Sequence, residues 1–132
     1  MTRIAISCVA LAILGLVAVH AAPQEDFLAQ LPTCEPFDVK AYSGYLNVTE
    51  TKQLHYMFVE SQDVPSTDPV VIWFNGGPGC SSLLGYFMEN GPFVMDDGQS
   101  VLHKNPDSWN RRANTLYIES PAGVGFSIAG TV

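Results

Sequence analysis

The most informative stretch of this sequence is VVIWFNGGPGCSS, residues 70–82. It begins with five apolar residues, β-branched at the start, and continues into Asn75 and a glycine-rich segment. Such a run predicts a strand that is buried on both faces and that the glycines end sharply. Residues 81–89 then carry apolar side chains at helical spacing, with Ser81 or Ser82 as the N-cap. The predicted order is strand, turn, helix.

The flanking sequence adds further strands. Residues 42–48 and 53–59 are β-rich and are separated by a short polar segment, which predicts an antiparallel hairpin whose second strand has two apolar faces. Residues 61–69 form a proline-containing polar loop, and residues 113–119 predict a second buried strand. A weak strand is expected near residues 100–103.

Residues 22–35 are polar and contain proline, and we interpret them as an arm. The apolar side chains of Phe27, Leu28 and Leu31 have a spacing that would allow one helical turn.

The glycine-rich turn suggests chemistry. A strand that ends in such a turn before a helix presents backbone N–H groups at its carboxyl end, where anions and developing oxyanions bind well. Glycine permits unusual φ/ψ values and lets a reacting carbonyl approach the backbone closely. A tight turn without a ligand is the alternative, and the turn alone favours that alternative.

The first residues have the layout of a secretory signal peptide. Arg3 precedes an apolar run over residues 4–19, and small residues follow at Ala21 and Ala22. We expect residues 1–21 to be the signal peptide, cleaved after Ala21. A membrane anchor is the alternative, but the run is shorter than the roughly 20 residues of a bilayer span. No stable membrane anchor is therefore expected after cleavage.

The remaining residues, 22–132, suit one modest domain or a piece of a larger one. Because Arg3 is the only charged residue within 1–21, cleavage would change the net charge from −7 to −8. This acidic balance disfavours a nucleic-acid partner.

Two features suit an oxidising compartment. Cys34 and Cys80 remain after cleavage and should form disulfides, either with each other or with partners that this chain does not contain. Asn47 opens an Asn-Val-Thr sequon, a candidate glycosylation site, although an unmodified polar turn is the alternative.

Four segments together resemble one family. They are YSGYLNV (42–48), WFNGGPGCSSLLGYFMENGPF (73–93), NPDSW (105–109) and NTLYIESPAGVGFS (114–127). In this order and spacing they resemble the serine carboxypeptidases. The resemblance implies the N-terminal part of an α/β-hydrolase fold, an incomplete α/β architecture whose mixed sheet carries an antiparallel hairpin at its edge. Asp107 and residues 128–132 depart from the family pattern.

The resemblance assigns roles to residues of the turn and to Glu89 at the end of the following helix. It implies that the N–H of Gly77 is one oxyanion donor, and that Asn75, Gly76 and Glu89 bind the C-terminal carboxylate of a peptide. A glutamate that faces a carboxylate repels it unless the two share a proton, so such a site works best at acidic pH. For Glu89 the alternative is a solvated carboxylate at a helix end.

Other residues follow from the same resemblance. Leu84 and Met88 lie one helical turn apart and are expected to wall the pocket for the leaving residue, with core packing as the alternative. The resemblance pairs Cys80 with a distant downstream cysteine rather than with Cys34. No catalytic thiol is expected, because no motif links a histidine to Cys80.

The sequence contains no Gly-x-Ser-x-Gly, so the triad of serine, aspartate and histidine is not expected within it. His55 and His103 are interpreted as ordinary strand or loop residues. We therefore expect this chain by itself to be inactive and to fold poorly, with apolar runs such as residues 70–74 exposed.

The function implied is a serine-type carboxypeptidase that releases C-terminal amino acids from peptides and proteins, in the lysosome, the vacuole or the extracellular space. No metal and no organic cofactor are implied, and a homodimer of the full-length enzyme is left open. Two alternatives remain: a secreted noncatalytic carboxylate-binding or inhibitory module, and an acyltransferase of the same fold.

Overall fold

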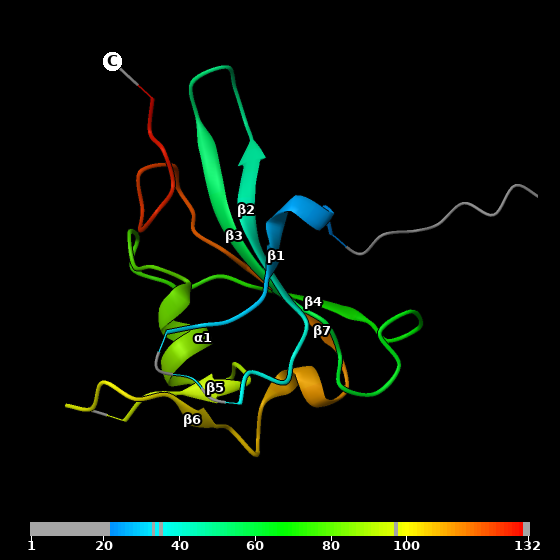
Figure 1. Ribbon diagram of the computed structural model, residues 1–132. Coiled ribbons are helices and arrows are strands. Elements are labelled where there is room, and N and C mark those ends of the chain that lie inside the picture. The colour runs from blue at the N-terminus through cyan, green and yellow to red at the C-terminus, as the bar shows by residue number, and fades with distance from the viewer. Residues whose placement is uncertain (1–21, 33, 35, 97, 131–132) are drawn as a thin grey trace, which may run out of the picture.

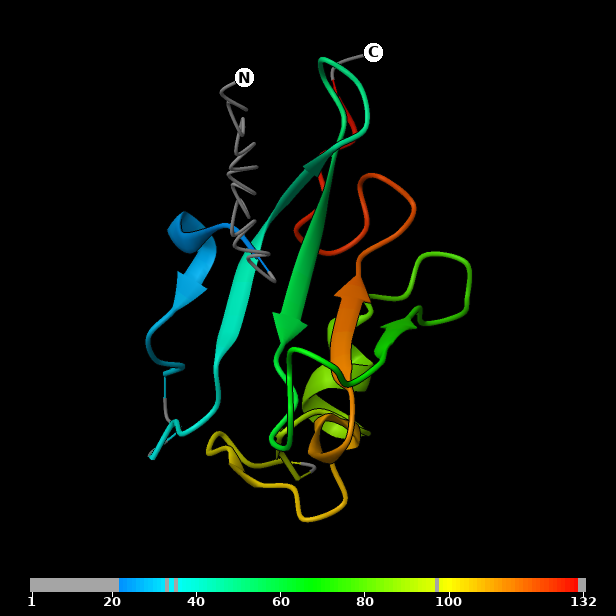
Figure 2. The same cartoon turned by 90° about the vertical axis from the view of Figure 1, so that its right-hand side faces the viewer.

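The computed structural model describes residues 22–32, 34, 36–96 and 98–130. Within these residues one mixed five-stranded sheet has the order β1-β2-β3-β7-β4, which Figure 2 shows nearly face on. Its strands are β1 (Phe27–Leu28), β2 (Ala41–Asn47), β3 (Gln53–Val59), β7 (Asn114–Ile118) and β4 (Val70–Trp73). The predicted signal peptide lies outside the described residues.

The predicted hairpin is confirmed. Strands β2 and β3 are antiparallel over their whole length, with Tyr42 opposite Phe58. The turn between them is closed by the N–H of Val48, which donates to the carbonyl of Lys52 at 2.9 Å. Strand β3 lies between β2 and β7, and its residues from His55 onward are all buried. Its two apolar faces are therefore both covered, as the alternation of the sequence indicated.

Strand β4 is exposed on one face, which agrees with the exposure expected of residues 70–74 in this chain by itself but not with burial on both faces. It pairs in parallel with β7, and within the described residues it has no second neighbour. The side chains of Val70, Ile72 and Phe74 are 59%, 53% and 56% exposed, whereas Trp73 packs against the core. The prediction of burial on both faces is therefore wrong. Only the face of β4 that turns toward helix α1 is covered, so alternate side chains point to solvent.

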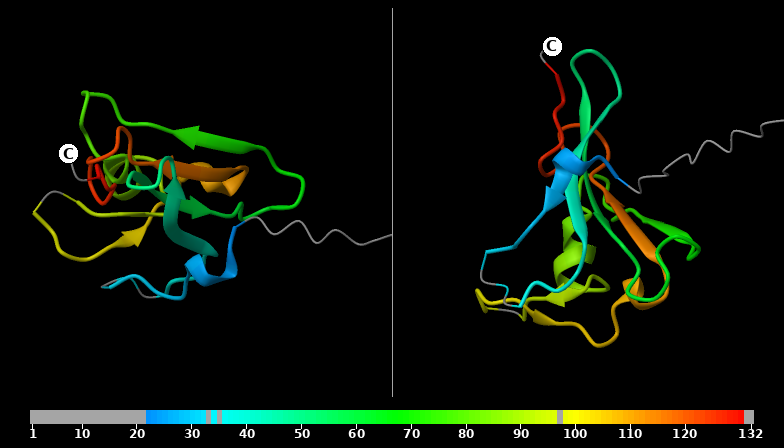
Figure 3. Two further views of the ribbon diagram at one scale, coloured as in Figure 1. Left: turned by 90° about the horizontal axis from the view of Figure 1, so that it is seen from above. Right: turned by 45° about the vertical axis from the view of Figure 1, so that its right-hand side comes forward.

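Helix α1 (Leu83–Met88) lies on one face of the sheet (Figures 1 and 3). Its Tyr86 is fully buried and stacks edge-on against Tyr117 of β7, with ring centroids 5.2 Å apart. Ser82 occupies the N-cap position without a side-chain capping bond, while Ser81 Oγ accepts the N–H of Leu83 at 3.2 Å. The helix is thus shorter than the predicted segment 81–89.

Apolar side chains pack on both faces of the sheet. The larger cluster lies on the face of α1 and contains Leu31, Cys34, Ala41, Met57, Val59, Tyr86, Phe93 and Tyr117. The smaller cluster contains Tyr42, Tyr56 and Phe58, whose side chains alternate with those of the larger one along β2 and β3.

The arm does not form the expected helical turn at Phe27 and Leu28. A short 3-10 helix (Gln24–Asp26) precedes β1, which pairs antiparallel with β2. Phe27 lies opposite Tyr42, and their rings meet edge-on at 5.6 Å. Pairing with strand β2 gives the backbone N–H and C=O groups of Phe27 and Leu28 hydrogen-bond partners. One isolated helical turn would leave most of these groups without partners.

The remaining elements are short. Strand β5 (Phe93–Val94) pairs with β6 (His103–Lys104), so the weak strand expected near residues 100–103 is displaced toward Lys104. A second 3-10 helix (Trp109–Arg111) leads into β7. After β7 the chain returns beside the hairpin, where Ile128 bridges to Gln53 (Figure 1).

Candidate active site

The site is built on the turn that follows β4. Gly76 to Cys80 are all exposed, and Gly77 and Gly79 have φ values of 137° and 97°. A Cβ at Gly77 would lie 3.0 Å from the nitrogen of Gly79 and 3.1 Å from that of Cys80. Residue 77 therefore has to be glycine, both because of its backbone angle and because the turn curls tightly around it.

The residues of this turn are exposed to solvent. In the part of the chain that the structure describes, the N–H groups of Gly76 and Gly77 make no hydrogen bond. A Cβ at Gly76 would meet nothing within 4 Å. The space beside Gly76 is thus open, whereas the Sγ of Cys80 would lie 3.3 Å from a Cβ at Gly77.

Asn75 is held in one orientation by its neighbours. Its side-chain oxygen accepts the indole N–H of Trp73 at 2.6 Å and the backbone N–H of Gly85 at 3.3 Å. Its own backbone N–H donates to Ser82 Oγ at 3.2 Å, and Ser82 Oγ donates to the carbonyl of Ile118 at 2.6 Å. Because both lone-pair directions of Oδ1 are used, the Nδ2 group of Asn75 is turned away from these contacts and is free to donate elsewhere.

Glu89 is the exposed C-cap residue of α1. Its backbone N–H donates to the carbonyl of Gly85 at 3.2 Å, one helical turn earlier, and Gly85 is the residue whose own N–H bonds to Asn75. The φ of −127° and ψ of −76° at Glu89 lie outside helical values, and within the described residues no hydrogen bond joins its side chain to Asn75.

The end of α1 is firmly anchored. Asn105 Nδ2 donates to the carbonyls of Glu89 at 3.3 Å and of Gly91 at 2.9 Å, and Tyr117 Oη donates to Asn90 Oδ1 at 2.8 Å. Burial raises the pKa of Tyr117 to about 12, and the nearby Glu89 carboxylate adds to this rise. Tyr117 therefore stays protonated and keeps its bond to Asn90.

Leu84 and Met88 are not core residues. Their side chains are 42% and 47% exposed, one turn apart on the outer side of α1. Core packing, the alternative that the sequence left open, is not seen for either residue within the described part of the chain. Their apolar surface is available to a ligand at this side of the helix.

The two cysteines are not bonded to each other. Cys34 is a buried free thiol in the arm, and Cys80 is an exposed free thiol in the turn. Burial raises the pKa of Cys34, and Asp38 adds to the effect. Of the pairings that the sequence left open, the described residues therefore do not form the one between Cys34 and Cys80.

The sequence analysis missed a buried polar network next to the turn. Glu119 is fully buried at the end of β7 and accepts a hydrogen bond from Ser81 Oγ. His55, interpreted above as an ordinary strand residue, is 6% exposed and places Nδ1 3.0 Å from Glu119 Oε2. His103, by contrast, is exposed, and its Nδ1 lies 3.8 Å from a carboxylate oxygen of the still more exposed Asp96. The signal for this network in the sequence was Glu119, a charged residue at the end of the predicted buried strand 113–119.

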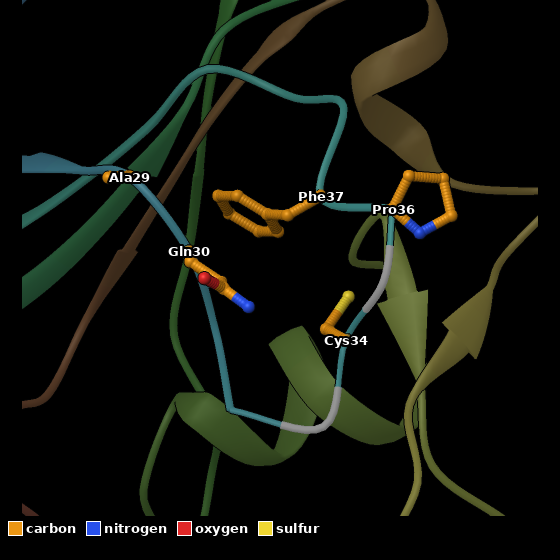
Figure 4. Close-up of a pocket in the computed structure, with 5 residues that line it drawn as sticks. All are labelled: Ala29, Gln30, Cys34, Pro36 and Phe37. Atoms are coloured by element: carbon orange, nitrogen blue, oxygen red, sulfur yellow. The ribbon is translucent and has the colours of Figure 1, made fainter.

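The described residues also contain cavities away from the turn. One cavity of about 600 Å³ is lined by Ala29, Gln30, Cys34, Pro36 and Phe37 of the arm. Figure 4 shows the side chains of Gln30, Cys34 and Phe37 around this space, with helix α1 behind them. None of these residues except Cys34 belongs to the predicted site. No group of three potential metal ligands occurs within the described part of the chain.

The strand order and the glycine-rich turn between β4 and α1 define the amino-terminal part of an α/β-hydrolase. The family model described as serine carboxypeptidase matches residues 32–132. This chain belongs to the serine carboxypeptidase family.

Individual relatives agree. The chain is 53% identical over 109 residues to the lysosomal protective protein of Mus musculus, covering 82% of this chain and 23% of that protein. It is 49% identical over 115 residues to a serine carboxypeptidase of Caenorhabditis elegans, covering 85% and 20%. A solved prohormone-processing carboxypeptidase from Saccharomyces cerevisiae matches with a TM-score of 0.59 and 28% identity, over 67% of this chain and 20% of that one.

The chain thus spans about a fifth of the length of the relatives that it matches. Among the described residues, no helix has the length and apolar character to cross a bilayer.

Proposed function

We propose that the full-length protein is a serine-type carboxypeptidase and that this segment supplies the oxyanion and carboxylate-binding half of its active site. One observation carries the proposal. The unbonded amides of Gly76 and Gly77 lie beside Asn75, whose side-chain oxygen is fixed so that its NH₂ group is left to donate. Membership of the serine carboxypeptidase family supports the same function.

The reaction would be an acyl transfer. A serine that other parts of the protein supply, with its histidine and aspartate, attacks the last peptide bond and forms a tetrahedral intermediate. The negative oxygen of that intermediate accepts the N–H of Gly77, and a second donor comes from outside this segment. An amide that is already in place needs no reorganisation as the charge develops, which lowers the barrier.

The free carboxylate of the substrate would bind beside this oxyanion site. The Nδ2 group of Asn75 and the N–H of Gly76 donate to it, and Glu89 shares a proton with it. An ionised Glu89 would repel the carboxylate, so binding weakens as the pH rises. This arrangement selects chain ends over internal peptide bonds and favours an acidic working pH.

The exposed side chains of Leu84 and Met88 would form part of the pocket for the leaving residue. They lie on the same helix as Glu89, and their apolar surface is uncovered within the described residues. We expect an apolar C-terminal residue to fit best against them.

We also propose passage through the secretory pathway, with residues 1–21 as the cleaved signal and Asn47 as a glycan acceptor. Asn47 ends β2 in an exposed turn. Cys80 is exposed in the turn and would pair with a cysteine elsewhere in the full-length protein. A lysosomal or vacuolar destination would match the acidic working pH.

The test is an assay of the purified full-length protein on an N-blocked dipeptide at acidic pH, with the C-terminal amide of the same dipeptide as the control. We expect release of the terminal amino acid from the free acid and much slower cleavage of the amide. No release at any pH, or equal rates on both substrates, would refute the proposal.

A further inference from the structure

Glu119 is a fully buried carboxylate just behind the oxyanion turn. It accepts hydrogen bonds from Ser81 Oγ, at the end of that turn, and from the backbone N–H of Phe126 at 2.8 Å. Burying a carboxylate costs several kcal/mol unless the charge is well paired, so a buried glutamate at this position needs a specific reason.

His55 fixes this carboxylate from the other side. Its Nδ1 lies 3.0 Å from Glu119 Oε2, and its Nε2 lies 2.9 Å from Ser43 Oγ of the neighbouring strand. With the proton on Nδ1, the ring donates to Glu119 and accepts from Ser43. The ring is itself held edge-on against Phe126, at a centroid distance of 5.4 Å.

The loop after β7 is shaped around Glu119. A Cβ at Gly125, whose φ is 53°, would overlap the carboxylate. Ser127 Oγ donates to the carbonyl of Glu119 at 2.7 Å and accepts the backbone N–H of His55 at 2.8 Å. The hairpin, the end of β7 and this loop therefore hold Glu119 in one position.

The two ends of the oxyanion turn are held by different contacts, although Ser82 also bonds the carbonyl of Ile118, next to Glu119. Asn75, at the start, is held by Trp73, Gly85 and Ser82. Ser81, at the end, is held by Glu119. Between them the turn is exposed, and its glycine amides are unbonded within the described residues. The position of the Gly77 amide therefore depends on both ends, on Asn75 and on where Ser81 is fixed.

We propose that Glu119 is a positioning residue for the oxyanion turn: through Ser81 it holds the Gly77 amide at the place where negative charge develops. This inference rests on the carboxypeptidase function proposed above. Asn75 keeps its bonds from Trp73 and Gly85 when the bond between Ser81 and Glu119 is lost, so the loss acts more on turnover than on recognition of the substrate carboxylate.

The test compares variants of the full-length enzyme. Ser81→Ala removes the hydroxyl that bonds to Glu119, and Ser81→Thr keeps a hydroxyl there. Ser61→Ala is the matched control, because Ser61 Oγ also donates to a carboxylate, Asp68 at 2.5 Å, and accepts the backbone N–H of Asp63 at 3.2 Å, as Ser81 accepts that of Leu83. Active sites are counted with a serine-reactive phosphonate, so that misfolded molecules do not contribute to kcat.

We expect Ser81→Ala to lower kcat by about 10- to 100-fold, the range for a small misplacement of a catalytic group. Its KM should stay within about twofold of wild type, because the three supports of Asn75 are intact. Ser81→Thr should recover most of the loss, and Ser61→Ala should leave kcat unchanged. Glu119→Gln combined with Ser81→Ala should cost no more than the larger single effect, since both act through one contact.

Several results would overturn the inference. A Ser81→Ala enzyme with wild-type kcat would do so, whether its KM is unchanged or higher than that of the wild type. An equal loss of kcat in Ser61→Ala would show that the effect is not specific to the turn. If the wild-type enzyme released no C-terminal residue, the proposed function would fail and this inference with it. An active wild type with an unaffected Ser81→Ala would refute the inference alone.

Discussion

The indole ring of Trp73 lies against the backbone of Gly85, so closely that a Cβ at residue 85 would overlap the ring. This contact lets the indole N–H and the N–H of Gly85 reach the same oxygen of Asn75. A glycine inside a short helix thus supports the proposed carboxylate site, although no ligand would touch it.

We predict that Gly85→Ala destabilises the full-length protein. In an open helix this change stabilises by about 1 kcal/mol, but here the added methyl group must displace Trp73, which costs about 1–3 kcal/mol. Thermal unfolding should show a lower Tm, and KM should rise because Asn75 loses its support. A Tm at or above the wild-type value would contradict the close packing.

The neighbouring glycines of the turn allow a matched comparison. Gly77→Ala should destabilise by about 1–3 kcal/mol, since an alanine is strained at a φ of 137° and its Cβ would crowd Gly79 and Cys80. Gly76→Ala should unfold like wild type, because its Cβ would meet nothing within 4 Å. Chemical denaturation of both variants measures the difference, and equal losses would refute it.

Asn75→Asp tests the orientation of the amide. The substitution keeps the oxygen that Trp73 and Gly85 bind but replaces the NH₂ donor with a second oxygen. Loss of a hydrogen bond to a charged group costs about 1.5–3 kcal/mol, so KM for free-acid peptides should rise about 10- to 100-fold. Substrates amidated at the C-terminus provide the control, and their KM should change little.

Glu89→Gln should flatten the pH dependence of substrate binding. In the wild type, ionised Glu89 repels the substrate carboxylate, so KM should rise as the pH increases toward neutrality. The variant has no ionisable group there, and its KM should stay nearly constant over the same range. Measurement of KM between acidic and neutral pH checks this, and parallel profiles for the two enzymes would argue against shared protonation.

Asn47→Gln addresses the glycan. Asn47 is exposed at the end of β2, where its side-chain oxygen accepts Gln53 Nε2 at 2.6 Å. Protein secreted from eukaryotic cells should lose one glycan-dependent shift in electrophoretic mobility, with carboxypeptidase activity retained because the hairpin turn lies away from α1. An unchanged mobility would show that the sequon is not used.

Local patterns predicted much of this fold. The alternation in residues 53–59 and the apolar run before Asn75 gave the correct strands, because each pattern depends on the immediate neighbours in the chain. Patterns failed where distant segments decide the outcome. Phe27 and Leu28 pair with β2, and alternate residues of β4 are exposed because only the face of β4 that turns toward α1 is covered within the described chain.

The site was only partly predictable for the same reason. The resemblance to the family indicated Asn75, Gly76, Gly77 and Glu89, and their roles in binding stay predictions. The supports of these residues come from elsewhere in the chain. No local pattern links Ser81 to Glu119, or Glu119 to His55, since each bond joins residues far apart in sequence.

The separate anchoring of the two ends of the turn has an evolutionary consequence. If the proposed function holds, mutations around Trp73 and Gly85 would act mainly on which chain ends are accepted, while mutations around Glu119 and His55 would act mainly on the speed of bond cleavage. Selection can then adjust preference and rate in independent steps. One short turn could in this way serve enzymes with different substrate preferences while its own conformation stays the same.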